Sequence, residues 1–130
     1  MSKKAQGHHI FLDYTAFYPP SSFDGNHMLR LMQEAVANSG AREVHAHVEN
    51  FDGSVSPIGF AAAVLIDESH VSAHCYSERG LLAIDAFTCG TTDPDSIVSQ
   101  LKSALEDLCP TLVLMKEKRV ERFLLPEALT

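Results

Sequence analysis

The chain has 130 residues, of which 45% are hydrophobic and 21% are charged, and this size and composition fit a single globular domain spanning residues 1–130. Its net charge of -7 comes from scattered Asp and Glu without a basic stripe, which argues against a nucleic-acid partner. No apolar run reaches the roughly 20 residues that a membrane-spanning helix needs, and no hydrophobic segment follows the lysines near the N-terminus. We therefore expect a cytoplasmic protein with no membrane partner, acting on a small molecule.

The first third of the chain predicts a strand, a helix and a second strand. Residues 7–14 alternate, with their aliphatic side chains on one face, and a Pro-Pro-Ser-Ser cluster ends this strand. Apolar residues recur at helical spacing over residues 28–36, and Asn-Ser-Gly at residues 38–40 stops the helix. Over residues 43–49 valine and alanine alternate with two histidines, which predicts a half-buried strand with the histidines on its other face.

Three strand-like runs follow in quick succession, at residues 60–66, 71–76 and 81–88. The intervals between them are too short for crossover helices, so we expect antiparallel neighbours. Asp93 and Pro94 then have the residue types of an N-cap and a first helical position, which predicts a second helix with a buried apolar stripe.

The end of the chain predicts a last strand near residues 111–115, followed by a solvated turn at the charged residues 116–119. Two amphipathic helices and a mainly antiparallel sheet of five or six strands predict an α+β fold. We expect a two-layer α/β sandwich with both helices on one face of the sheet. The other face then needs cover, which a homodimer that pairs sheets or sheet edges would supply.

The three cysteines include no CxxC pair, which argues against a disulfide framework and against a closed zinc site. Cys75 and Cys109 are predicted to be small packing residues. Cys89 differs from both, because it lies between a threonine and a glycine at the end of a predicted strand.

Reactive side chains are densest at residues 67–76 (Asp-Glu-Ser-His-Val-Ser-Ala-His-Cys-Tyr), and again at Asp85 and residues 87–90 (Phe-Thr-Cys-Gly). Taken singly, each is most often a satisfied polar group of a sheet. A hydrolase triad is a further interpretation, but Ser69 lacks the Gly-x-Ser-x-Gly elbow that exposes a nucleophile. The clustering of these residues favours a shared chemical role.

A metal site is another interpretation of the same cluster. His45 and His47 share one face of a predicted strand, and His70 and His74 share a face of another, with Cys89 as a possible thiolate ligand. Histidines on a solvated strand face are common, and no acidic residue is placed to complete a catalytic shell, so we expect no metal.

A self-cleavage reaction would use more residues of this cluster than the polar-group, hydrolase or metal interpretations do. A serine hydroxyl at position 69 can attack the carbonyl of Glu68 held under strain, converting the amide into an ester, and a nearby base then removes the serine α-proton. The dehydroalanine that remains hydrolyses to an N-terminal pyruvoyl group, which forms a Schiff base with an amino acid and takes up the electrons released as carbon dioxide leaves. A hairpin turning at residues 77–80 is expected to bring a base, His74, and an acid, Cys89, together.

The motifs of this region also have a characteristic order. Glu-Ser-His stands at residues 68–70, His at 74, Gly at 80, Asp at 85 and Phe-Thr-Cys-Gly at 87–90. In these motifs and their spacing the chain resembles the prokaryotic S-adenosylmethionine decarboxylase proenzymes. The similarity is strong over residues 57–90 and weaker at Gly-His-His-Ile in residues 7–10.

The resemblance implies an α/β sandwich that matures by cutting its own backbone. The bond between Glu68 and Ser69 would be cleaved, giving a β chain of residues 1–68 and an α chain of residues 69–130 that begins with a pyruvoyl group derived from Ser69. His74 would be the base for ester elimination. The active unit would be a homodimer with its sites at the interface.

The resemblance also implies the substrate, S-adenosylmethionine, and the residues that hold it. Cys89 would reprotonate the carbanion after decarboxylation, and Glu78 would accept hydrogen bonds from the ribose hydroxyls. Tyr76 stands where the family has a tryptophan and Val55 where it has an aromatic residue, the two adenine-stacking positions. Phe60 is expected to compensate for Val55, and a pyruvoyl-dependent arginine or ornithine decarboxylase is the alternative if it does not.

One further position departs from the family. Ala61 stands where the family has Ser or Thr, whose hydroxyl assists the acyl shift. The absence of this hydroxyl predicts that self-cleavage of the Glu68–Ser69 bond is slow or does not occur. An unprocessed, non-catalytic paralogue is therefore the hypothesis from a different class.

Overall fold

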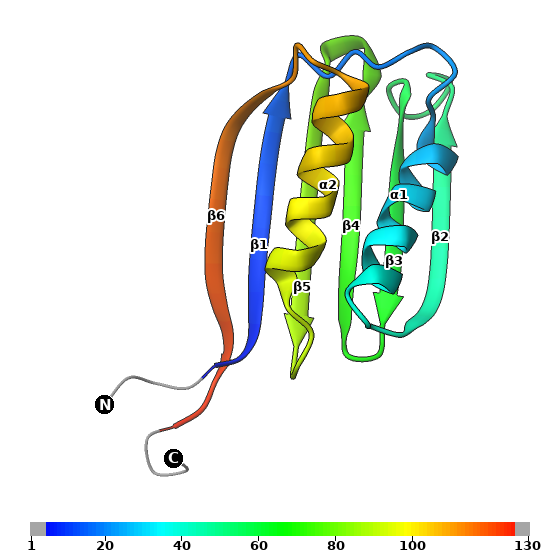
Figure 1. The fold of residues 1–130 in the computed structure, drawn as a ribbon. Coiled ribbons are helices and arrows are strands. Elements are labelled where there is room, and N and C mark those ends of the chain that lie inside the picture. Colours follow the sequence, from blue (N-terminus) through cyan, green and yellow to red (C-terminus); the bar gives the residue numbers. More distant parts are fainter. Residues whose placement is uncertain (1–4, 127–130) are drawn as a thin grey trace.

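Six strands form one antiparallel sheet in the computed structural model, which describes residues 5–126 (Figure 1). The order across the sheet is β2-β3-β4-β5-β1-β6, and every neighbouring pair is antiparallel. This confirms the predicted α+β sandwich. The strands are β1 (Ala5–Thr15), β2 (Glu43–Phe51), β3 (Gly59–Ile66), β4 (Ser69–Tyr76), β5 (Leu81–Cys89) and β6 (Val113–Leu124).

Two helices cover one face of the sheet, as predicted, and Figure 1 shows both on the same side. In α1 (Gly25–Asn38) the Asp24 carboxylate accepts hydrogen bonds from the first free backbone amides of the helix. In α2 (Pro94–Leu108) the predicted N-cap, Asp93, accepts from the backbone amide of Asp95 at 2.9 Å. A short 3₁₀ turn, η1 (Ser77–Arg79), joins β4 to β5.

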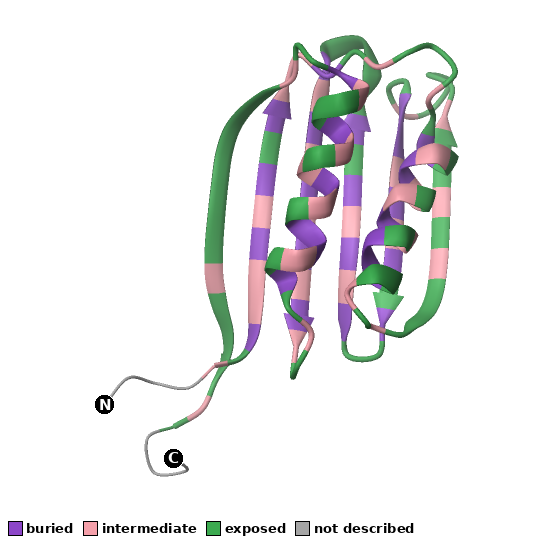
Figure 2. Ribbon diagram, in the orientation of Figure 1, coloured by how far each residue is buried: buried purple, intermediate pink, exposed green. Residues whose placement is uncertain are grey.

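The hydrophobic core lies between the sheet and the two helices. Along β3, β4 and β5 buried and more exposed residues alternate, which appears as banding of the strands in Figure 2. Cys75 and Cys109 are buried in this core, as predicted from their apolar neighbours. The largest fully buried side chains of the core are those of Leu12, Phe17, Met28, Met32, Leu82, Ile84, Ile97, Leu101 and Leu105.

The prediction for the charged residues 116–119 was wrong, because they lie within β6 and pair with β1. β6 is an edge strand, so water reaches both of its faces and an apolar alternation is not required. Its charged side chains on the helix side meet α2, where Glu117 pairs with Lys102 and Arg119 with Asp95. On the opposite side Lys116 lies 5.8 Å from the centre of the Phe11 ring.

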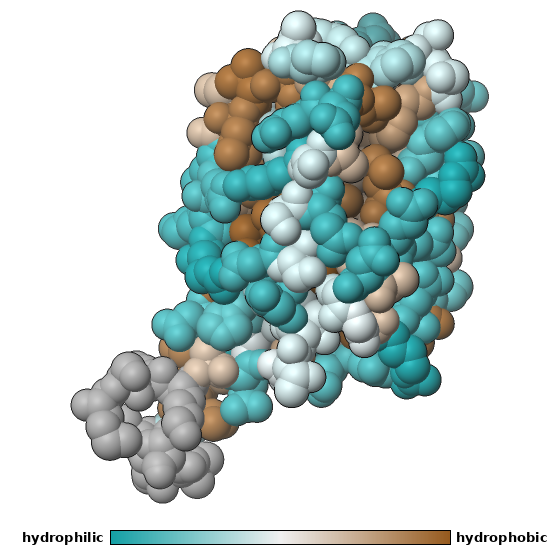
Figure 3. Space-filling model, viewed as in Figure 1, coloured by the Kyte–Doolittle hydropathy of each residue, from teal (hydrophilic) through white to brown (hydrophobic). Residues whose placement is uncertain are grey.

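The other face of the sheet is covered by neither helix. We call this side, which carries Ala61, His74, Ala83 and Cys89, the uncovered face. Figure 3 shows the opposite, helix-bearing side, where hydrophilic surface extends over both helices and hydrophobic surface lies between them and near the start of β6. Among residues 5–126, no helix is both long and apolar enough to span a bilayer.

Candidate active site

The expected cleavage bond lies in the tight turn between β3 and β4. Ile66 pairs with Ser69, so Asp67 and Glu68 alone make the connection. Asp67 has a φ of 32°, a conformation that is strained for a residue with a side chain, and its carboxylate accepts a hydrogen bond from Arg42 Nε at 3.1 Å. The chain is thus held in a strained conformation immediately before the Glu68–Ser69 bond.

Cys89 contacts both sides of this bond. Its backbone amide donates to Ser69 Oγ at 2.8 Å, and its thiol Sγ lies 3.5 Å from the carbonyl oxygen of Glu68. Ser69 is only 7% exposed. The end of β5 therefore fixes the serine hydroxyl and supplies a thiol donor to the carbonyl that this hydroxyl would attack.

Gly7 makes room for the Cys89 side chain. It lies opposite Cys89 in the pairing of β1 with β5. A Cβ at this position would come within 3.2 Å of Cys89 Sγ and 3.0 Å of the Phe87 ring, both tighter than ordinary contacts. Because residue 7 is a glycine, the Cys89 side chain has room to place its thiol close to the Glu68 carbonyl oxygen.

His74 lies far from this centre within one chain. It pairs with Ala61 on one side and Ala83 on the other, five residues along β4 from Ser69. At about 3.3 Å per residue the separation along the strand is about 16 Å. The prediction that the β4–β5 hairpin brings His74 to Cys89 was therefore wrong for a single chain, because antiparallel pairing places the two at opposite ends of β5.

A second group of expected site residues surrounds His74. A cavity of about 260 Å³ is lined by His74, Tyr76 and Met115, among others, and a smaller one of about 170 Å³ by His74, Tyr76 and Phe51. Tyr76 is 47% exposed, and the Arg79 guanidinium lies 5.6 Å from its ring centre. The exposed ring of Tyr76 is available to stack on a planar ligand.

Two phenylalanines line the smaller cavity together with Tyr76, namely Phe60, the expected one, and Phe51. Phe60 is 4% exposed and belongs to the core, where its ring centre lies 6.4 Å from that of Phe23. Its ring therefore packs on the helix side, although the residue also borders the smaller cavity. Phe51, which pairs with Gly59 at the edge of the smaller cavity, lies on the uncovered face instead.

Phe51 was missed in the sequence. Strand parity could have found it, because His45, His47 and Phe51 are separated by even numbers of residues along β2 and so share one face.

The remaining ligand-binding candidates, Val55 and Glu78, are solvent-accessible. Val55 is 97% exposed in the loop before β3, and Glu78 is exposed in η1. Both lie at the His74 end of β4 rather than at the Ser69 end.

Two histidines and an aspartate gather on the uncovered face, toward the Ser69 end of β4. His9 Nε2 lies 3.0 Å from Asp85 Oδ1, and the rings of His70 and Phe87 flank His9 at 6.4 Å and 5.9 Å between centres. Burial, and then the neighbouring His9, lower the pKa of His70. The His70 ring is thereby favoured in its neutral form.

The histidines of the metal interpretation do not converge. His45 and His47 lie on the edge strand β2, whereas His70 and His74 lie on β4, with β3 between them. Within residues 5–126, no three His, Cys, Asp or Glu side chains are close enough to bind one ion.

Comparison with known proteins assigns the chain to a family. The family model described as S-adenosylmethionine decarboxylase matches residues 8–124, nearly the whole chain and both groups of site residues. The chain belongs to the S-adenosylmethionine decarboxylase family.

Relatives in this family come from bacteria and archaea. The S-adenosylmethionine decarboxylase proenzyme of Symbiobacterium thermophilum is 36% identical over 106 residues, covering 81% of this chain and 77% of the relative. That of Pyrococcus horikoshii is 33% identical over 96 residues, covering 73% and 66%. The crystal structure of the Aquifex aeolicus adenosylmethionine decarboxylase shares the fold, with a TM-score of 0.73 at 24% identity over 95% of this chain and 96% of the other.

Proposed function

We propose that this chain is a proenzyme that cleaves itself between Glu68 and Ser69 and then decarboxylates S-adenosylmethionine in the cytoplasm, supplying the aminopropyl donor for spermidine and polyamine synthesis. The observation that carries the proposal is the double contact of Cys89 with Ser69 Oγ and with the Glu68 carbonyl. Membership of a family of named proenzymes supports it.

The residues around the cleavage bond fit a pyruvoyl group formed from Ser69. Such a group supplies an electrophilic carbonyl that withdraws the electrons left when carbon dioxide departs. The Glu68 carbonyl is within reach of the Cys89 thiol, and the strained turn at Asp67 presents it to the Ser69 hydroxyl. After cleavage the same thiol, on the uncovered face, would return a proton to the substrate carbon.

A homodimer completes the site in this proposal. His74 lies about 16 Å along β4 from Ser69, so within one chain it cannot act on the serine α-proton. Both ends of β4 border the uncovered face. A two-fold axis through this face would bring the His74 end of one chain to the Ser69 end of its partner, twice in each dimer.

The uncovered face has the properties of a surface that pairs with a copy of itself. Its central residues Ala61, Ala63, Ser72 and Ala83 are small and partly buried, although no helix covers them. Small side chains allow a second sheet to approach closely, at about 10 Å between packed sheets. Tyr76 and Glu78, near His74, would then contribute to the partner's substrate pocket.

Mass spectrometry of the purified, denatured chain tests the cleavage. We expect two fragments that together account for the full mass, with the α fragment blocked at its N-terminus, and we expect a Ser69→Ala variant to remain intact. An intact wild-type chain would instead identify a non-catalytic paralogue, the outcome that Ala61 favours.

Carbon dioxide release from S-adenosylmethionine, arginine and ornithine, measured side by side, tests the substrate. We expect release from S-adenosylmethionine alone, with the exposed Tyr76 ring and Glu78 binding the nucleoside. Faster release from arginine or ornithine would show that the loss of an aromatic residue at Val55 has changed the specificity.

A further inference from the structure

Two buried polar atoms beside the cleavage serine have no hydrogen-bond partner among the described residues: Thr88 Oγ1 and His8 Nδ1. Thr88 is 1% exposed. The two residues lie directly opposite each other where β1 pairs with β5. Buried polar groups are nearly always paired, so two adjacent exceptions indicate a role other than holding the fold.

Ser69 lies in the same row of paired residues across the sheet as Thr88 and His8. His70 pairs with Phe87, so the next position of the antiparallel register sets Ser69 beside Thr88, and Ser69 Oγ is bonded to the amide that follows Thr88. Ser69 and Thr88 are buried, and along their strands they share the helix-facing side with the core residues. Side chains opposite each other on one face lie about 4.5–5.5 Å apart at Cβ, a gap that rotation of the two hydroxyls can close.

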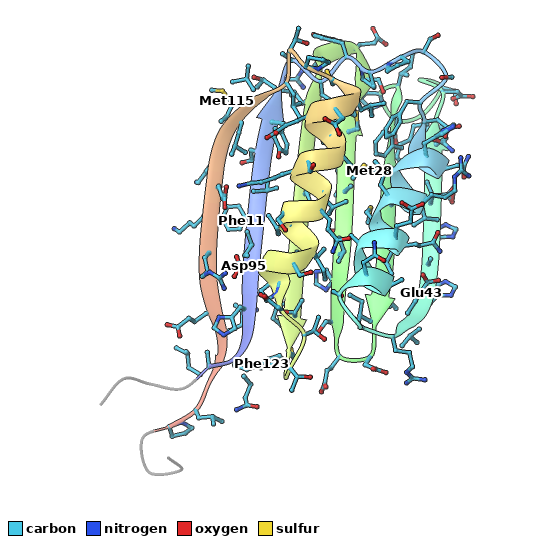
Figure 4. All side chains as sticks on the ribbon, viewed as in Figure 1. Phe11, Met28, Glu43, Asp95, Met115 and Phe123 are labelled. Carbon is cyan, nitrogen blue, oxygen red and sulfur yellow. The ribbon has the colours of Figure 1, made fainter. Side chains whose placement is uncertain are left out.

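The row lies at the end of the sheet where β4 starts and β5 ends, beneath the start of α2 (Figure 1). Figure 4 shows Asp95, in the first turn of α2, and Phe123, in β6, at this end of the molecule. Ser69, Thr88 and His8 thus follow one another across β4, β5 and β1.

Self-cleavage requires an acceptor for the Ser69 hydroxyl proton, and the other nearby groups are engaged, distant or on the other face of the sheet. His70 follows Ser69 directly, but its ring lies with His9 and Phe87 on the uncovered face, whereas Ser69 faces the helices. Cys89 acts as a donor both to Ser69 Oγ and to the Glu68 carbonyl. His9 is bonded to Asp85 on the uncovered face. His74 of the same chain is about 16 Å away along β4, and the proposed function assigns the partner's His74 to the later removal of the serine α-proton.

We propose that Thr88 and His8 form the proton path of self-cleavage, an inference that rests on the proposed function. As Ser69 Oγ bonds to the carbonyl carbon of Glu68, its proton passes to the Thr88 hydroxyl, which gives its own proton to His8 Nδ1. When the Glu68–Ser69 carbon–nitrogen bond breaks, His8 returns the proton through the same path to the released Ser69 amine. The amide becomes an ester and an amine, with no net change in protons.

This path accounts for processing without a hydroxyl at position 61. Ala61 pairs with His74 and Glu49, at the opposite end of β4 from the cleavage bond. In one chain a serine at that position would not reach Ser69, and in the proposed dimer the partner's Ala61, beside the partner's His74, brings no hydroxyl to it. Thr88 supplies a hydroxyl from the neighbouring strand instead.

The test is the rate of chain cleavage after cell-free synthesis, followed by denaturing mass spectrometry at successive times. Thr88→Val keeps the shape of the side chain and removes the hydroxyl, so we expect it to fold normally and to cleave at least about tenfold more slowly. Thr88→Ser restores the hydroxyl, and we expect it to cleave within about threefold of wild type. Thermal unfolding by circular dichroism serves as the folding control.

His8→Ala provides an independent arm. We expect cleavage to slow by roughly a hundredfold and to recover when imidazole is added, a recovery that a purely structural role would not produce. Folded Thr88→Val cleaving at the wild-type rate, or His8→Ala cleaving at that rate without imidazole, would overturn the proton path. Failure of the folded wild-type chain to cleave would instead overturn the proposed function itself.

Discussion

Cys89 contacts the proposed cleavage bond through two separable groups. The contact with Ser69 Oγ comes from the backbone amide, whereas the contact with the Glu68 carbonyl comes from the thiol. A side-chain substitution therefore removes only the second. Maturation and turnover are expected to depend on this residue to different degrees.

Cys89→Ala should slow cleavage without abolishing it, because the thiol donor to the Glu68 carbonyl is lost while the backbone amide still holds Ser69 Oγ. It should reduce decarboxylation more, by at least about a hundredfold, because the proton donor is lost. Fragment masses and carbon dioxide release from the same preparation measure the two effects. Cys75→Ala, which removes a buried thiol of the core, is the matched control and should keep both activities. Full turnover by Cys89→Ala would show that another group reprotonates the substrate.

Tyr14 illustrates the effect of burial on a single ionisable group. Its hydroxyl has no partner among the described residues, and burial raises its pKa to about 12 from 10.0, with contributions from Glu106 and Glu117. Between pH 10 and 12 the unfolded chain loses this proton while the folded chain keeps it. The free energy of unfolding therefore falls as the pH rises through this window.

Tyr14→Phe should remove this fall, which we expect to be roughly 1 to 3 kcal/mol, and should be no less stable than wild type at pH 7 because no hydrogen bond is lost. Urea unfolding at pH 7 and at several values between 10 and 12 measures both effects. Tyr18→Phe, at an exposed tyrosine, should leave the pH dependence unchanged. Identical pH curves for Tyr14→Phe and wild type would rule out ionisation of Tyr14 as the cause.

At the scale of elements, α2 shows how a few residues place a helix over the site. Asp93 caps it, Pro94 begins it, and its ion pairs reach Glu117 and Arg119 of β6. The ion pairs are exposed and each contributes at most about 1 kcal/mol. The cap and the buried stripe therefore dominate the position of α2.

Asp93→Ala should lower the free energy of unfolding by about 1 kcal/mol, because the amide of Asp95 loses its acceptor. Asp107→Ala makes the same change in the last turn of α2, where a carboxylate opposes the helix dipole, and it should not destabilise the chain. Urea denaturation of the two variants makes the comparison, and equal losses would argue against a capping role.

At the scale of the whole molecule, the two groups of site residues lie at opposite ends of β4. The Ser69 end carries the cleavage bond and the thiol, and the His74 end carries the imidazole and the exposed Tyr76 ring. Neither group is sufficient for the proposed reaction. A homodimer across the uncovered face would bring them together.

Co-expression of His74→Ala with Cys89→Ala tests this arrangement. In a heterodimer one site would receive both substitutions and the other none, so random pairing should restore roughly a quarter of the wild-type activity. Each variant alone should be nearly inactive. No recovery in a mixture that forms heterodimers would show that each site is built from one chain.

Ala63→Glu checks the interface separately, because it introduces a charge at the middle of the uncovered face. We expect sedimentation to show a monomer, whereas Ser103→Glu, on the exposed side of α2, should stay dimeric.

The sequence by itself determined the local structure, because local structure depends on neighbours along the chain. Period-two alternation marked the central strands, helical spacing marked both helices, and the cap at Asp93 was identified from residue type. The Glu-Ser-His and Phe-Thr-Cys-Gly motifs likewise indicated the family without any structure.

Only the tertiary structure decided which distant residues meet. Antiparallel register sets Cys89 beside Ser69 and carries His74 to the other end of the sheet, and no pattern within either strand specifies that pairing. Pairing with β1 likewise made a strand of the charged residues 116–119, whose composition indicated a turn. Strand pairing depends on contacts between segments far apart in the chain, so these features arise only when the whole sheet is assembled.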